Sequence, residues 1–340
     1  MTPYGELGRV GQASRIRPLA RRALAAYGLG AARLALLQHL HNTTYRVGPA
    51  HGRRPFVLRV HVPRRHGPTE LRSEFRWLEA LRGEGLAVPG PLRTRCGEWW
   101  TEAVAEGVPE ARLCTLLRWV PGRFARRRRT PALLGRVGAF VARLHELAKS
   151  FRPAPDFARP RWDHQTLVGR RSPVAAGWGR LRAGQARLFE AVGERLLCAC
   201  ERLGEGPEEF GLIHGDFNFK NLLFCRGEVR AIDFDDCGFG HFLYDLGVLL
   251  ETLVFRPDYL ALRAALLDGY RRVRLLPSEQ EVLLDTFVAA RWVHVGLVMW
   301  ARQELATARA YAPRFMKIVE PNLRGFLRVS EKGEPWVPHR

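Results

Sequence analysis

The hydrophobic pattern of this chain changes near residue 120, and this change constrains the fold more than any other feature. Before it, short runs of branched and apolar residues, separated by turn residues, predict an antiparallel three-strand meander. After it, apolar residues recur mostly at helical spacing. The sequence therefore predicts an α+β protein, with a small antiparallel β-rich lobe followed by a larger, mostly helical lobe.

The same patterns predict the individual elements and the boundaries of the lobes. Strands are expected at 34–40, 43–47 and 56–60, a helix at 70–81, a strand pair at 92–95 and 99–103, and a strand at 113–120 that Pro121-Gly122 ends. Later elements are a helix at 133–147, a long helical region at 175–203, a hairpin at 222–224 and 229–232, and helices from 242 onward. We expect a leader at 1–28, a first lobe at 29–120 and a second lobe at 121–340.

Composition narrows the class of protein further. Hydrophobic residues make up 46% of the chain and charged residues 26%, which is typical of a globular protein and not of a disordered one. The six cysteines are scattered without a C-x-x-C pair, which favours reduced thiols and a cytoplasmic location. No segment has the pattern of a secretory signal, and the apolar stretch 286–301 carries Arg291 and His294, so no membrane span is expected.

The chain is strongly basic, with a net charge of +20, and 50 of its 54 basic residues are Arg. One interpretation is a polyanionic partner; the other is a coding preference for Arg with the charge spread over solvated faces. The charge runs along the whole chain, which favours the second. The densest run, Arg126–Arg129, is either a solvated loop or a contact for an acidic ligand. No nucleic-acid-binding module is present, so nucleic acid is the least favoured partner.

The most informative segment is residues 213–221, with the sequence IHGDFNFKN, followed by AIDFDD at 231–236. It contains an Asp, an Asn five positions later and a second Asp at the end of a hairpin, which together provide what phosphoryl transfer requires. One carboxylate can orient a hydroxyl and take its proton, while an amide oxygen and another carboxylate hold Mg²⁺ on the phosphates. Any one of these residues alone would be typical of a turn, but the order and spacing of all three indicate function.

These motifs resemble the aminoglycoside phosphotransferase and choline kinase family of protein-kinase-like enzymes, most clearly over residues 210–250. The resemblance implies a two-lobed protein-kinase-like fold, with ATP bound as MgATP and its phosphate moved to a hydroxyl. It implies Asp216 as the catalytic base, Asn221 and Asp233 as Mg²⁺ ligands, and Asp245 as a buried residue that braces the catalytic loop. His145 and His214 are expected to be scaffold residues without a chemical role.

The first lobe is expected to hold the nucleotide. Arg59 lies on a predicted strand where the kinase fold usually has a phosphate-gripping Lys, and Glu74 on the next helix is its expected partner, with Glu70 also available. Alternatively, Arg59 points to solvent from an edge strand. The turn 41–44 stands where a glycine-rich loop would be, with Asn42 and Thr43 as candidate nucleotide contacts. The segment 116–122, which includes Trp119, resembles the hinge whose backbone would bind adenine.

Three functions follow from these residues. The first is a phosphotransferase that acts on a small-molecule hydroxyl; the second is a protein Ser/Thr kinase of the bacterial stress-response type, suggested by Asp235-Asp236; the third is a nucleotide-binding pseudokinase. Between Asp285 and Glu304 there is no acidic residue, which disfavours a polycationic acceptor such as an aminoglycoside. Arg291 and Arg302 on this stretch either clamp a neutral or anionic acceptor or are solvated, with Trp292 and Trp300 in the core.

Overall fold

The computed structural model describes residues 2–40, 42–48, 54–125, 129–170, 174–332 and 336–338. The chain folds into two compact units, the first formed by residues 1–122, 152–158 and 230–232 and the second by 123–151, 159–229 and 233–340. The elements of the first unit are the 3₁₀ helix η1 (Tyr4–Glu6), α1 (Arg9–Ala26), β1 (Arg33–His39), β2 (Thr43–Gly48), β3 (Phe56–Val60), α2 (Pro68–Gly83), β4 (Pro91–Leu92), β5 (Trp100–Ala103) and β6 (Arg112–Arg118).

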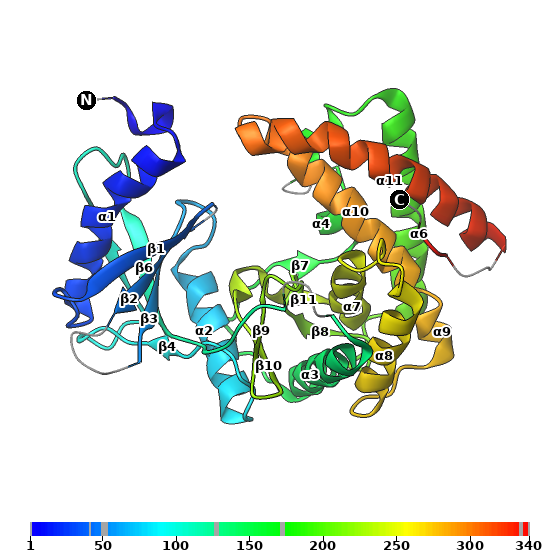
Figure 1. The fold of residues 1–340 in the computed structure, drawn as a ribbon, viewed down its shortest axis with the longest axis horizontal. Coiled ribbons are helices and arrows are strands. Elements are labelled where there is room, and N and C mark those ends of the chain that lie inside the picture. The colour runs from blue at the N-terminus through cyan, green and yellow to red at the C-terminus, as the bar shows by residue number, and fades with distance from the viewer. Residues whose placement is uncertain are drawn as a thin grey trace. The chain divides into compact units, whose positions relative to one another are not determined.

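The first unit is built on one antiparallel sheet with the strand order β1-β2-β3-β6-β4, and β5 also pairs with β6 (Figure 1). The expected meander of β1, β2 and β3 is confirmed. The expected pairing of 92–95 with 99–103 is wrong. β4 pairs with Leu116–Leu117 and β5 with Arg112–Thr115, so the two strands follow one another along the same edge of β6.

Residues 1–28 do not form a leader outside the first lobe. One side of α1 is buried, and its residues Leu19, Ala23 and Leu24 join a hydrophobic core with Tyr45, Val47, Leu58, Val60, Cys114 and Leu116 of the sheet. Because side chains alternate between the faces of a strand, these sheet residues define the face that α1 covers. Helix α1 is therefore part of the first unit, contrary to our expectation.

The second unit is mostly helical, as expected. The remaining elements of the chain are α3 (Pro131–Ser150), β7 (Arg161–Trp162), α4 (His164–Val168), α5 (Ala175–Trp178), α6 (Ala183–Leu203), β8 (Phe210–Ile213), β9 (Leu222–Cys225), β10 (Glu228–Ala231), η2 (Phe234–Asp236), β11 (Gly238–His241), α7 (Phe242–Glu251), α8 (Tyr259–Arg271), α9 (Ser278–Glu281), α10 (Leu284–Ala301) and α11 (Ala306–Lys332). The expected helical region 175–203 is interrupted between α5 and α6. The sequence patterns did not reveal a three-stranded sheet in the order β7-β11-β8.

Helices α3 and α8 approach so closely that their backbones touch. A Cβ added to Gly138 would lie 2.0 Å from the carbonyl oxygen of Leu266, and one added to Gly269 would lie 2.0 Å from that of Gly135. Only hydrogen fits at these positions, so the glycines set the distance between the two helices.

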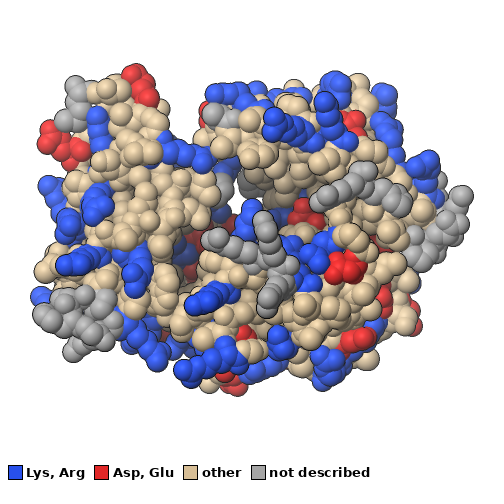
Figure 2. Space-filling view, viewed as in Figure 1, with Lys and Arg blue, Asp and Glu red and all other residues tan. Residues whose placement is uncertain are grey.

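Helix α10 crosses the middle of the second unit, in contact with α4, α5, α6, α7 and α11 (Figure 1). The stretch Ser278–Ala301 is long and apolar enough to span a membrane by composition, but 61% of its most apolar window is buried inside the protein. Burial of this kind is typical of a core helix. Arg and Lys side chains occur on the visible surface of both units, whereas Arg126–Arg128 lie outside the described residues (Figure 2).

Candidate active site

The candidate catalytic loop, residues 214–221, connects β8 to β9 in the second unit. Its second residue is Gly215, whose φ of +78° is unfavourable for residues with a side chain. A Cβ at this position would lie 2.4 Å from the carbonyl oxygen of Asp236 and 2.6 Å from Nε1 of Trp162. Gly215 therefore permits the loop to lie directly against the segment that follows Asp233.

Asp245, on α7, fixes the start of this loop. It is completely buried, and its carboxylate accepts hydrogen bonds from the backbone N–H groups of His214 at 2.8 Å and Gly215 at 3.0 Å. The same carboxylate lies 3.3 Å from Nε2 of His145. The expected bracing role of Asp245 and the expected scaffold role of His145 are both confirmed by these contacts.

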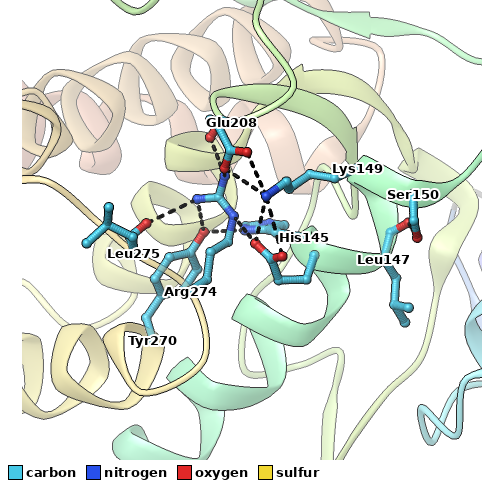
Figure 3. A network of polar contacts seen from close by, with 9 residues as sticks. His145, Leu147, Lys149, Ser150, Glu208, Tyr270, Arg274 and Leu275 are labelled. Carbon is cyan, nitrogen blue, oxygen red and sulfur yellow. Dashed lines mark hydrogen bonds and ion pairs between the residues drawn. The ribbon is translucent and has the colours of Figure 1, made fainter.

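A buried polar network continues from His145 toward the surface (Figure 3). Burial lowers the pKa of His145, so the ring is neutral near pH 7; with Nε2–H donating to Asp245, Nδ1 accepts from the Tyr270 hydroxyl at 2.9 Å. Arg274 donates to the same hydroxyl at 3.2 Å, and its Nε lies 3.0 Å from the Glu146 carboxylate. The network thus links the catalytic loop to α3 and α8.

Asp216 is held by donors on both carboxylate oxygens. Arg291 donates to Oδ1, and the Asn221 amide donates to Oδ2 at 3.1 Å and to the Asp216 carbonyl oxygen at 2.9 Å. Burial by itself would raise the pKa of Asp216, but Arg291 and His214 outweigh it, so the pKa is lowered. The carboxylate is therefore ionised near neutral pH, and its orientation is fixed from two sides.

Arg291, which donates to Oδ1 of Asp216, lies in the middle of the apolar helix α10. Its side chain is 14% exposed, and it also donates to the Tyr244 hydroxyl at 3.2 Å. The alternative that Arg291 is solvated is therefore wrong, whereas Trp292 is a core residue. Glu251, at the end of α7, also interacts electrostatically with Arg291, and burial raises the pKa of Glu251. The sequence left Arg291 open as either an acceptor clamp or a solvated residue, and it gave no sign of the contact with Asp216.

Asp233 lies at the end of the β9–β10 hairpin in a left-handed backbone conformation, with φ 65° and ψ 63°. Such a conformation in a residue other than glycine is unfavourable and requires support from its surroundings. The support comes from Arg159, which donates to the carbonyl oxygens of Asp235 at 2.6 Å and Cys237 at 2.7 Å. Trp162 donates to the carbonyl oxygen of Asp236 at 2.7 Å. No sequence motif identified Arg159 or Trp162.

The residues of this unit fit a Mg²⁺ site by their chemistry. The Asn221 amide nitrogen is committed to Asp216, which leaves its amide oxygen as an acceptor, and the Asp233 carboxylate is exposed. Carboxylate and amide oxygens are the ligand types that Mg²⁺ prefers. His214 is fully buried and its ring contacts the rings of Phe217 and Phe234, which agrees with the expected scaffold position.

In the first unit, Arg59 and Glu74 form a buried ion pair. Arg59 is 3% exposed, and its Nη2 lies 2.8 Å from each oxygen of the Glu74 carboxylate. The alternative that Arg59 points to solvent from an edge is wrong, because β3 lies between β2 and β6. Glu70 has a separate role: its carboxylate accepts from the backbone N–H of Gly67 at the start of α2.

The other candidate nucleotide residues have contacts of their own. The Asn42 side chain accepts from the backbone N–H of Val62 at 3.1 Å, and His41 lies outside the described residues. The Trp119 backbone N–H donates to the carbonyl oxygen of Pro55 at 3.3 Å, and the guanidinium of Arg46 lies over the Trp119 ring.

Thr43 and Thr44 lie on opposite faces of the sheet. Thr44 is the cross-strand partner of Arg59, and directly opposite residues share a face. Thr43 lies on the other face, where its hydroxyl bonds with His39 at 2.8 Å. The structure therefore does not bring Thr43 to Arg59; of the two threonines in the turn 41–44, Thr44 is the one on the Arg59 face.

Comparison with known proteins identifies the family. The model of the phosphotransferase enzyme family matches residues 34–281. Amicoumacin kinase of Bacillus subtilis (strain 168) is 26% identical over 237 residues, which cover 69% of this chain and 67% of the relative. Homoserine kinase of Acidiphilium cryptum (strain JF-5) is 28% identical, with 78% of this chain and 80% of the relative covered.

Solved structures agree with this result. The microcompartment-associated aminopropanol kinase has a TM-score of 0.82 and 27% identity, covering 94% of this chain and 99% of its own. Amicoumacin kinase hAmiN, in complex with AMP-PNP, Ca²⁺ and Ami, has a TM-score of 0.75 at 20% identity, with 92% and 95% covered, and shows the shared fold. The expected protein-kinase-like fold and kinase activity on a hydroxyl group are thereby confirmed. This chain belongs to the phosphotransferase enzyme family.

Proposed function

We propose that this enzyme transfers the γ-phosphate of ATP to a hydroxyl group of a small molecule, with Asp216 as the catalytic base and with Mg²⁺ held by Asn221 and Asp233. The observation that carries the proposal is the fixed, ionised carboxylate of Asp216, which has a donor on each oxygen. In the proposed organisation, residues 29–120 bind the nucleotide, and residues 121–340 provide the catalytic base and the acceptor site.

Asp216 is suited to orient the acceptor and take its proton. A carboxylate has about four lone-pair positions, so donors on Oδ1 and Oδ2 leave further positions for an acceptor hydroxyl. Since rotation of the carboxylate would break one of these bonds, its remaining lone pairs have a fixed direction. Mg²⁺, when bound through Asn221 and Asp233, would neutralise charge on the phosphates during transfer.

Arg59 is proposed to bind phosphate oxygens of the nucleotide. Its ion pair with Glu74 is the contact that positions the phosphate-binding cation in protein kinases, here with a guanidinium in place of an ammonium. We further propose Thr44, beside Arg59, together with Asn42 and the backbone near Trp119, as nucleotide contacts. ATP with a divalent cation is supported by the related amicoumacin kinase, whose complex holds AMP-PNP and Ca²⁺.

A small-molecule acceptor is favoured over a protein. The relatives are named for amicoumacin, homoserine and an aminopropanol, all of them small molecules. No specific observation favours a protein Ser/Thr acceptor or a pseudokinase. A cytoplasmic location is also proposed, because all six cysteines are free thiols in the structure, consistent with a reducing compartment.

The test is ADP formation from MgATP with candidate acceptors present. The panel includes an aminopropanol, L-homoserine, amicoumacin, a kanamycin-type aminoglycoside and casein. Asp216→Asn, Asn221→Ala and Asp233→Ala are compared with wild type and with Asp268→Asn, which alters an exposed carboxylate on α8. We expect ADP formation to depend on a small hydroxyl compound, to be lost in the first three variants and to be retained in Asp268→Asn.

Other results would contradict the proposal in specific ways. Phosphorylation of casein alone would indicate a protein kinase, and nucleotide binding without turnover for any acceptor would indicate a pseudokinase. Undiminished turnover in Asp216→Asn would show that Asp216 is not the base. Efficient phosphorylation of the aminoglycoside would contradict the expectation from the acid-free stretch of α10.

A further inference from the structure

The first unit contains a cavity that the proposed function does not use. Its volume is about 390 Å³, and it lies beside α1, with Gln12, Ile16, Thr43 and Val60 in its lining. Val60 belongs to the core that α1 covers, so the cavity adjoins the sheet face opposite Arg59 and Glu74. It is therefore separate from Arg59 and Thr44, which lie on the other face of the sheet.

The most unusual residue in this cavity is Arg112, at the start of β6. It is 7% exposed, and its Nε is buried without a hydrogen-bond partner; among the described residues, no hydrogen bond or ion pair holds its guanidinium. The guanidinium lies over the ring of Tyr4, whose centre is 5.8 Å away. Burial lowers the pKa of Arg112, and it does so although the nearby Tyr4 and Glu110 act in the opposite direction. A buried cation without a partner is strongly unfavourable, so an anion beside Arg112 would be stabilising.

The other polar groups around the cavity are already satisfied by one another. His39 Nε2 donates to the side-chain oxygen of Gln12 at 3.2 Å, so its Nδ1 accepts from the Thr43 hydroxyl at 2.8 Å. The Gln12 amide nitrogen in turn donates to the carbonyl oxygen of Tyr4 at 3.2 Å. These three residues therefore do not require a ligand, whereas the buried Arg112 guanidinium offers N–H groups to one.

The charge of the cavity indicates a single negative charge on the ligand. Arg64 and Glu110, which also line the cavity, form an ion pair at 3.2 Å and offset each other. Burial also lowers the pKa of His39, so that ring is neutral. Glu110 also interacts electrostatically with Arg112, so the charged residues of the lining, Arg64 and Arg112 against Glu110, leave a net charge of +1. A guanidinium can bind both oxygens of one carboxylate.

Exposed apolar side chains complete the lining. Leu40 is 53% exposed and Val62 is 38% exposed, and both line the cavity together with the buried Ile16. An apolar ligand body would cover these side chains and remove their surface from water. We propose that this cavity binds a small organic monocarboxylate, whose carboxylate pairs with Arg112 and whose apolar body lies against Leu40 and Val62.

The test uses sodium benzoate as the probe, with benzamide as its uncharged counterpart and sodium phosphate as a different oxyanion. Binding to the full chain is measured by calorimetry and by thermal unfolding at constant ionic strength. We compare wild type with Arg112→Met, Arg112→Lys and the control Arg33→Met, which removes an exposed Arg from β1 of the same sheet. Benzoate should raise the melting temperature of wild type and Arg33→Met, whereas benzamide should not.

Both Arg112 variants should bind benzoate at least tenfold more weakly than wild type, because the guanidinium supplies the charge-assisted hydrogen bonds. Without ligand, Arg112→Met should melt at or above the wild-type temperature, since it removes a buried charge that has no partner. A clearly lower melting temperature would show that Arg112 stabilises the fold, and would overturn the proposal. Equal benzoate binding in wild type and Arg112→Met, a response to phosphate alone, or no response to any anion would also overturn it.

Discussion

His294 should make the stability of this protein depend on pH. The side chain is 9% exposed, its Nδ1–H donates to the carbonyl oxygen of Leu167 at 3.0 Å, and its ring meets the ring of Trp162 edge-on. Burial, and then the nearby guanidinium of Arg291, lower the pKa of His294 from 6.5 to about 4. In the unfolded chain this histidine would regain its ordinary pKa.

The sign of the effect follows from proton binding. Between pH 6.5 and 4, the unfolded chain binds a proton at His294 that the folded protein does not, so the free energy of unfolding rises with pH in this range. The stabilisation is fully present above pH 6.5 and is lost as the pH falls toward 4. For the two pKa values, linkage gives a loss of about 2 kcal/mol at pH 5 and of about 3 kcal/mol below pH 4.

The measurement is urea unfolding of wild type and His294→Asn at pH 7.5, 6 and 5. Asn keeps a side-chain N–H for the Leu167 carbonyl but cannot take up a proton. Other histidines with lowered pKa values, His39, His145, His164 and His241, affect both proteins equally and cancel in the difference. Between pH 7.5 and 5, wild type should lose about 2 kcal/mol more than the variant. Stability curves that stay parallel within about 0.5 kcal/mol would refute the reasoning.

The remaining predictions concern the catalytic and binding residues. Asp216→Asn should lower kcat by about 10²–10⁴-fold and leave MgATP binding nearly unchanged, measured by ADP formation and nucleotide titration. Asp233→Ala should abolish the rise in melting temperature that MgATP produces, and an unchanged rise would exclude Asp233 as a metal ligand. Arg59→Ala should raise the KM for ATP and spare the KM for the acceptor; equal effects on both would indicate a structural role. Arg291→Met should lower kcat by about 10²-fold with little change in the KM for ATP, whereas Arg263→Met, which removes a comparable ion pair with Asp285, should not.

Sequence patterns predicted those helices and strands that have a recognisable hydrophobic pattern within their own residues. Alternating residues in β2 and β3 and the helical spacing in α2 placed these elements within a few residues of their bounds. Which strands pair with one another could not be predicted in this way, because strand pairing depends on residues that are far apart in the chain. β4 has two residues, and both it and β5 find partners on β6. The strand β11 contains two glycines and pairs with β7 and β8, so its sequence carries no strand signal.

The residues of the candidate site could likewise be predicted only where their signal lies within one short segment of the chain. Spacing identified Asp216, Asn221 and Asp233, because all three lie in one short segment. The face of the sheet on which Thr43 lies depends on the strand register, which a one-residue change would reverse. Arg159 was not identified, because it acts on backbone carbonyl groups about 76 residues away, and a contact with a carbonyl leaves no pattern in the partner's sequence.

The close contact between α3 and α8 has a consequence for protein engineering. Gly138 lies seven positions before His145 on α3, and Tyr270, the partner of His145, lies on α8 directly after Gly269. A side chain at either glycine would force the helices apart and lengthen the bond that links Asp245 to Tyr270 through His145. A library that varies the chain to find new acceptors should therefore keep Gly138 and Gly269 unchanged, although neither residue takes part in the chemistry.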